Sequence, residues 1–398
     1  MGSPVKIIGL LSGGLMGSDP WDPSSFSGVS VSLFNALKDE GVLGRTFGLD
    51  ISRFEFMMRA APRWHPSKEV WRRRVYQSRA YREALTRDLR RKISEDDRNS
   101  VILALGSYAD SPAVYKGVAP VITYQDALGA EYWLSPFAPE AIKRDTALRE
   151  QHWSFETSVA QGAARVLTCS EYVRRAFGQH YGISQDKVVN VGVGCNTAFP
   201  KAMPRKDYSQ PEIIFIGKEF ERKGGALLSD AFAEVRRHVP EAILHVIGPP
   251  TRPESLPEAP GVVFHGFLSR NDPAQAKLFY ELLERAALNL LPSRWEPAGI
   301  APLEAMAYGA PAIVTDNWAL KEYVQHGVTG LHLADLTSEA IAAAILDALS
   351  DKARLARMSE AAYSTTPERF SWRGVARRII ASAEEAWAES QATKQLVQ

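Results

Sequence analysis

The sequence predicts an α/β protein built from two doubly wound domains. Its 398 residues exceed what a single core of ordinary size holds. Short β-branched segments alternate with helical segments along most of the chain, as they do in parallel sheets. The alternation is interrupted once, by the basic, proline-containing segment 196–207, and then restarts. We therefore expect the domain linker in that segment.

The first half of the chain is expected to form one sheet with the strands 5–11, 101–105, 121–124, 166–168 and 188–191. A loop rich in Gly, Ser, Asp and Pro follows the first strand, and Gly28 ends it, directly before a helix closed by Gly41. This is a candidate ligand loop; a solvated insertion is the alternative. Asp126 follows another strand, at the sheet edge where α/β proteins bind ligands.

The second half repeats the pattern. Its predicted strands are 213–216, 243–247, 262–264, a short strand from 290, 312–314 and 330–333. Its predicted helices are 226–237, 274–286 and 338–350.

The stretch from Leu290 to Asp316 carries the first chemical signal. It predicts a strand, a loop with Glu296 and Gly299, a helix of three turns or fewer that ends before Gly309, and a second strand. Gly299 permits close approach of the backbone to a ligand, and a helix start at the carboxyl edge of a strand favours an anion. Because Glu296 and Glu304 would repel that anion, we expect them to bind hydroxyl groups beside it. A nucleotide sugar offers both groups.

A second signal is the sequence GKEFERKGG, which follows the first strand of the second half. Lys218, Arg222 and Lys223 precede a pair of glycines, and a helix is expected to start at once. Cations, flexible backbone and a helix N-terminus at one place suit a diphosphate; the alternative is a charged turn. We expect this loop to lie two strands away from the Glu296 loop.

Composition limits the compartment and the partners. The 47 Lys and Arg nearly balance the 46 Asp and Glu, so the charge of the whole chain argues neither for nor against a polyanionic partner. We expect no nucleic acid among the partners. No apolar run approaches the roughly 20 residues of a membrane span. The N-terminal residues do not fit a secretory signal, and Gly2 lacks the Ser or Thr that myristoylation requires, because Lys6 stands there. Cys169 and Cys195 cannot form a disulfide framework, so we expect a cytoplasmic protein.

Residues 69–93 are expected to form one amphipathic helix with many arginines on its outer face. A helix of this kind can lie on the anionic inner face of a membrane as a weak peripheral contact. An ordinary solvated helix is the alternative, since acidic residues are interspersed and follow it.

Four sequences, in their order and spacing, resemble the C-terminal domain of the retaining glycosyltransferases of family 4: FIGKEFERKGG, VVFHGFLSR, EPAGIAPLEAMAYGAP and LKEYVQHGVTGL. The segment 170–199 resembles the end of that family's first domain, and 370–387 its last helix. The resemblance implies the GT-B fold, in which two doubly wound Rossmann-like domains face each other across a cleft. It implies an acceptor-side domain over 1–200, a donor domain over 201–370, and a helix over 371–398 that returns to the first domain.

The resemblance also assigns roles to the candidate donor residues. Glu304 is implied to bind the ribose hydroxyls, Glu296 a hydroxyl of the donor sugar, and Lys223 the diphosphate. The family's second cation corresponds to Lys218 here, so that residue or Arg222 is expected to act with it.

The resemblance extends these roles to backbone groups. Amides near Gly299 and Ile300 are implied to contact phosphate, and the backbone of residues 265–268 the base. Gly28 resembles the small residue that faces the diphosphate from the first domain.

One position departs from the family pattern. Many members have a histidine after the strand that corresponds to 121–124, and that histidine touches the donor sugar. This chain has no histidine there, so we expect Asp126 to hold the sugar or the acceptor.

The expected activity is that of a hexosyltransferase-like enzyme. A sugar would pass from a nucleoside diphosphate, such as a UDP- or GDP-sugar, to the hydroxyl of a glycan, a lipid-linked compound or a small molecule, with retention of anomeric configuration. Lys223, Glu296 and Asp126 are the expected catalytic residues. The cations take the place of a metal ion, so we expect no metal site and no cofactor. The alternatives are a nucleotide-sugar epimerase or hydrolase, and a non-catalytic protein that binds nucleotide sugars or glycans.

Overall fold

The computed structural model describes residues 5–397, so Gly2 lies outside the described residues. The chain divides into two compact units: unit 1 runs to Gly194 and resumes at Trp372, and unit 2 is Cys195–Ser371. The division lies just before the segment 196–207. Within residues 5–397, no helix combines the length and the apolar composition that crossing a membrane requires.

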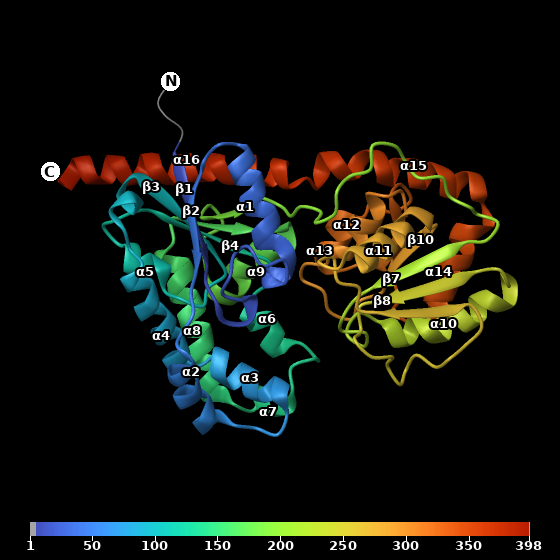
Figure 1. Cartoon of the computed structure of the whole chain (residues 1–398), viewed down its shortest axis with the longest axis horizontal. Helices are drawn as coiled ribbons and strands as arrows, with labels where there is room; N and C mark the ends of the chain where they lie inside the picture. The colour runs from blue at the N-terminus through green and yellow to red at the C-terminus, as the bar shows by residue number, and fades with distance from the viewer. Residues whose placement is uncertain (1–4, 398) are drawn as a thin grey trace. The chain divides into compact units, whose positions relative to one another are not determined.

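Unit 1 is built on a parallel six-stranded sheet in the order β2-β1-β3-β4-β5-β6 (Figure 1). The strands are β1 (Lys6–Leu11), β2 (Leu43–Gly48), β3 (Ser100–Leu105), β4 (Val121–Gln125), β5 (Arg165–Thr168) and β6 (Val188–Asn190). The helices are α1 (Val29–Asp39), α2 (Arg53–Ala60), α3 (Lys68–Tyr76), α4 (Arg79–Arg91), α5 (Ser111–Tyr115), α6 (Gly129–Leu134), α7 (Glu140–Lys143), α8 (Thr146–Gly162), α9 (Glu171–Tyr181) and α16 (Trp372–Val397). The last helix belongs to unit 1 because it packs on α1 and on the sheet.

The single helix expected over 69–93 is wrong. The structure has two helices there, α3 and α4, because the extended residue Ser78 interrupts them and its side chain accepts a hydrogen bond from the amide of Tyr81. Such N-cap residues stabilise a new helix start at the expense of continuity. The sequence interpretation also overlooked β2 and α2, which lie between the first helix and this region.

Buried charges attach α4 to α8. Arg82 is 1% exposed, and its Nη2 donates to Nδ1 of His152 at 2.5 Å. The Glu156 carboxylate lies 3.9 Å from the same guanidinium and 3.5 Å from the other ring nitrogen of His152. Burial lowers the pKa of His152 to about 4, so the imidazole stays neutral beside the arginine.

Unit 2 is built on a second parallel sheet of six strands in the order β12-β11-β10-β7-β8-β9. The strands are β7 (Glu212–Ile216), β8 (Ile243–Ile247), β9 (Val262–Gly266), β10 (Leu288–Leu291), β11 (Ala312–Thr315) and β12 (Gly330–Leu333). The helices are α10 (Gly225–His238), α11 (Pro273–Arg285), α12 (Ala301–Met306), α13 (Trp318–Tyr323), α14 (Ser338–Ser350) and α15 (Lys352–Arg369).

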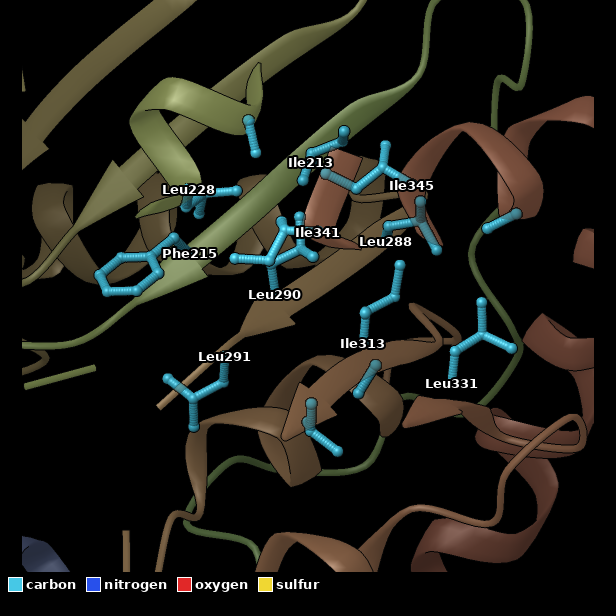
Figure 2. Close-up of a cluster of buried hydrophobic side chains, with 14 of the residues drawn as sticks. Ile213, Phe215, Leu228, Leu288, Leu290, Leu291, Ile313, Leu331, Ile341 and Ile345 are labelled. Carbon is cyan, nitrogen blue, oxygen red and sulfur yellow. The ribbon is translucent and has the colours of Figure 1, made fainter. Parts of the chain in front are cut away.

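The core of unit 2 lies between its sheet and two packed helices, α10 and α14. Figure 2 shows side chains from neighbouring strands, among them Ile213 and Leu288, gathered with Leu228 of α10 and Ile341 of α14. All four are fully buried. Strands buried on both faces read as continuous apolar runs, which is why the sequence located them closely.

The strand order of unit 2 reverses between β7 and β10. These two strands pair directly, with Ile213 opposite Leu288, so the expected separation of two strands is wrong. In doubly wound sheets, ligands bind outside the carboxyl ends of the strands at such a switch point. The loops that follow β7 and β10 carry most of the candidate donor residues.

Candidate functional site

An ion pair joins the two loops at the switch point. Nζ of Lys223, from the loop after β7, lies 2.7 Å from Oε2 of Glu296, from the loop after β10. The glutamate is 4% exposed, and the lysine side chain is 14% exposed. The structure thus brings together two of the three expected catalytic residues.

Two further side chains hold the same carboxylate. Nη1 of Arg222 lies 3.3 Å from Oε2 of Glu296 and also donates to the carbonyl of Trp295. The buried hydroxyl of Ser293 donates to that oxygen at 3.3 Å. Burial alone would raise the pKa of Glu296, but the neighbouring lysine and arginine outweigh it and lower that pKa below its usual range. Glu296 is therefore an anion held by two cations and a hydroxyl.

Glycines allow the two loops to approach each other. A Cβ on Gly224, whose φ is 77°, would lie 1.9 Å from the carbonyl oxygen of Pro292. A Cβ on Gly217 would lie 2.2 Å from Cδ of Lys223. These residues are therefore required for a close backbone approach and for the path of the lysine side chain. Gly224 is also the N-cap of α10, so Lys223 stands directly before a helix start.

Gly299 performs a related role beside Glu296. A Cβ at this position would lie 2.7 Å from Cγ of Glu296 and 3.0 Å from Cδ2 of Leu320. The glutamate side chain therefore folds against the bare backbone of Gly299.

Replacing Gly299 with alanine is expected to displace Glu296 from its cations. We expect a loss of roughly 1–3 kcal/mol in the free energy of unfolding, which is the usual cost of overpacking, together with a fall in any activity that depends on the ion pair. Chemical denaturation measures the first effect. Gly44→Ala is the matched control, because a Cβ there meets no atom closer than 3.5 Å. Equal stability of the two variants would contradict the packing described.

The second carboxylate, Glu304, lies inside α12 and is 6% exposed. Its Oε1 accepts a hydrogen bond from Nη1 of Arg270 at 2.8 Å. Burial raises its pKa, and the charges of Arg270 and Lys223 only partly oppose this rise. A desolvated carboxylate with a single side-chain donor among residues 5–397 has oxygen lone pairs left for hydroxyl groups.

Two further candidates of unit 2, Lys218 and Ile300, have different surroundings. The Lys218 side chain is exposed, with Nζ 4.5 Å from the centroid of the Phe267 ring. Ile300 is the N-cap residue of α12 and has no side-chain cap. The helix ends as expected before Gly309, whose φ is 76° and whose amide donates to the carbonyl of Met306.

Two candidates belong to unit 1. Gly28 is buried, has φ 83° and is the N-cap of α1, a conformation that an L side chain strains. Asp126 directly follows β4 and is partly buried, and its backbone carbonyl accepts from the Cys169 thiol at 3.6 Å. Neither belongs to the cluster around Glu296 described for unit 2.

Two residues of the cluster were missed in the sequence. Ser293 stands three positions before Glu296 in the same loop. This short spacing could have predicted that the serine hydroxyl donates a hydrogen bond to the glutamate carboxylate. Arg270 pairs with a carboxylate 34 positions away, which no local pattern reveals. Among residues 5–397, no group of three or more His, Cys, Asp and Glu side chains is placed to hold a metal ion.

A known protein family matches most of the second half of the chain. Residues 200–365 match the family described as Glycosyl transferases group 1. The chain carries a group 1 glycosyltransferase domain. The matched residues all lie within unit 2.

Relatives of known name cover much of the chain. A "Glycogen synthase" of Mycobacterium tuberculosis is 27% identical over 238 residues, which is 58% of this chain and 56% of that protein. A "GDP-mannose-dependent alpha-(1-6)-phosphatidylinositol monomannoside mannosyltransferase" of Mycolicibacterium smegmatis is 28% identical over 270 residues, 60% of this chain and 70% of that protein. The match thus spans little more than half the length of the first of these relatives.

Solved structures resemble nearly the whole chain. A "Sucrose-phosphate synthase" from Thermosynechococcus elongatus has a TM-score of 0.67 at 18% identity and covers 98% of this chain and 99% of its own. Anabaena HepE in complex with UDP has a TM-score of 0.63 at 16% identity, with 96% and 100% covered. These likenesses confirm the GT-B fold with its two parallel α/β sheets.

Proposed function

We propose that the protein transfers a sugar, with retention of anomeric configuration, from a nucleoside diphosphate to an acceptor hydroxyl. The observation that carries this proposal is the pairing of Lys223 and Arg222 with the buried carboxylate of Glu296 at the β7–β10 switch point. Cations suit a diphosphate, and Glu304 suits hydroxyls. Retention rests on the family resemblance.

The reaction requires stabilisation of the leaving diphosphate. The C–O bond between the sugar and the diphosphate breaks, negative charge grows on the leaving oxygen, and the acceptor oxygen bonds to the sugar carbon. Lys223 and Arg222 would stabilise that charge. The leaving oxygen itself takes the proton of the acceptor hydroxyl. Because these side chains supply the positive charge, we propose that no divalent metal is needed and that a chelator leaves turnover unchanged.

Glu296 would play two parts in this scheme. Its carboxylate orients the lysine and the arginine before substrate arrives. Once the diphosphate takes over those cations, the carboxylate is available to a hydroxyl of the donor sugar. Asp126 stays a proposed contact of the sugar or acceptor and Gly28 of the diphosphate, while Lys218, Gly299 and Ile300 stay proposed donor contacts.

The donor class follows from the same chemistry and from the relatives. HepE has been solved with UDP and UDP-glucose, and the mycobacterial mannosyltransferase is named for GDP-mannose. We propose a UDP- or GDP-sugar. We also propose a cytoplasmic location, since two cysteines cannot form a disulfide framework.

Purified protein incubated with UDP-, GDP- and ADP-sugars tests the function. We expect release of nucleoside diphosphate that depends on an added acceptor, together with a glycosylated product by mass spectrometry. A new nucleotide sugar would instead indicate an epimerase, and acceptor-independent release a hydrolase. Binding without any turnover across the donor and acceptor panels would indicate a non-catalytic protein.

A further inference from the structure

An exposed apolar surface lies on α2 and the segment that follows it. Phe54, Met57, Met58 and Trp64 are 74%, 67%, 63% and 69% exposed, respectively. The first three are spaced so that they share one side of the helix. Single exposed apolar residues are common, but four large ones within eleven positions mark an interaction surface. We call these four residues the α2 patch.

The helix that carries the α2 patch packs against other helices of unit 1. Phe56 has its ring centroid 6.0 Å from that of Tyr76 and 6.5 Å from that of Tyr81, and Trp71 packs on the same ring. The amide of Glu55 is capped by Ser52. Figure 1 shows α2, α3 and α4 at one end of this unit, and these three helices contact one another. The α2 patch is therefore presented on a packed helix.

The surroundings of the α2 patch are strongly basic. Residues 53–92 contain 13 Lys and Arg but only four Asp and Glu, while the whole chain has a net charge of +1. Several of these arginines are exposed, including Arg53, Arg72 and Arg79. Two copies of such a surface repel each other, which argues against self-association through it. Apolar and aromatic side chains interleaved with arginines on a helix are the combination that binds an anionic lipid interface.

A cavity of about 530 Å³ adjoins the α2 patch. It opens at the loops that follow β1 and β2, and its lining includes Gly14, Asp50, Arg53, Met57, Tyr76 and Tyr81. Met57 belongs both to this lining and to the α2 patch. The volume lies in the range of roughly 300–1,000 Å³ usual for small-molecule sites. Aromatic walls with one carboxylate and one guanidinium suit a hydroxylated, anionic headgroup.

We propose that the α2 patch docks unit 1 on an anionic lipid bilayer and that the adjoining cavity takes the hydroxylated headgroup of a lipid from it. Docking stands independently of the transfer activity. The role of that lipid as the acceptor rests on the proposed function. The membrane contact expected of residues 69–93 thus has its apolar part on α2, while α3 and α4 add positive charge.

Vesicle co-sedimentation of the full chain tests the docking. We expect binding to phosphatidylglycerol vesicles, weakening as salt rises, and at least about tenfold weaker binding to phosphatidylcholine vesicles. The triple variant Phe54→Ser, Met58→Ser, Trp64→Ser should lose binding to the anionic vesicles by at least about tenfold. Val328→Ser, at a 49% exposed valine of unit 2, is the matched control and should bind as the wild type does. Unchanged binding of the triple variant, or no binding by the wild type, would overturn the proposal.

A third variant separates docking from occupation of the cavity. Met57→Trp keeps an apolar side chain in the α2 patch but enlarges the residue that lines the cavity. We expect its vesicle binding to be retained, while protection of the Tyr76 and Tyr81 region from hydrogen exchange by a short-chain phosphatidylinositol is lost. If the wild type shows no such protection, the headgroup site is wrong. Neither readout depends on transfer, so failure of the proposed function and failure of the lipid site are distinguishable.

Discussion

Replacing Lys223 with alanine is expected to lower kcat by roughly 10²–10³-fold, the usual consequence of removing one group that stabilises developing negative charge. The effect should fall on kcat more than on KM, because the charge on the leaving diphosphate grows during the reaction. Steady-state release of nucleoside diphosphate measures it. Lys277→Ala, on the exposed surface of α11, is the control and should retain full activity.

The ion pair with Glu296 requires a second variant. If Lys223 served only to hold that carboxylate, Lys223→Ala and Glu296→Gln would have equal effects, and the double variant would be no worse than either. We expect instead that Glu296→Gln retains more activity than Lys223→Ala, because the lysine stays next to the diphosphate. Near wild-type turnover of Lys223→Ala with an intact fold by circular dichroism would refute the diphosphate role.

Replacing Glu304 with alanine is expected to weaken the binding of the free nucleoside diphosphate by roughly 10–100-fold. The reason is that hydrogen bonds to a charged group contribute about 1.5–3 kcal/mol. Burial raises the pKa of this carboxyl group, and Arg270 is its only side-chain donor among the described residues, so ribose hydroxyls would be favourable partners. Isothermal titration calorimetry measures the change.

The ligand itself offers the matched control for Glu304. A 2′,3′-dideoxynucleoside diphosphate should bind the wild type about as weakly as the ribonucleotide binds the variant, and the variant should not distinguish the two. An unchanged Kd for the ribonucleotide, or a variant that still prefers the ribose hydroxyls, would remove this assignment.

The elements that the sequence predicted closely are those buried on both sides. In unit 2, β8, β11 and β12 lie within a residue of the strands expected there. Most of their positions are buried, since a sheet covered by helices leaves few positions for polar residues. The overlooked strand β2 is different. It reads LGRTFG, lies at the sheet edge and is only partly buried, so neither alternation nor a continuous apolar run marks it.

The helices show the same dependence on context. Residues 69–93 have continuous helical spacing, yet Ser78 ends that continuity by capping a new helix. A serine inside a helical pattern is compatible with both outcomes, and here its side chain caps α4, which contacts α8. The exposure of the apolar side of α2 could not be predicted either. Apolar residues spaced three and four positions apart indicate that they share one face of a helix, but this spacing does not indicate whether another element packs on that face.

For the candidate site, the sequence by itself determined the chemistry: cations before a pair of glycines, and two carboxylates around a short helix. The tertiary structure decided which of these groups meet. Ile213 and Leu288 are opposite each other in the sheet although they are 75 positions apart, and this pairing brings Lys223 to Glu296. The tertiary structure also brings Arg270 to Glu304. Residue types follow from local chemical requirements, whereas partners depend on the order in which strands enter the sheet, which is a property of the whole fold.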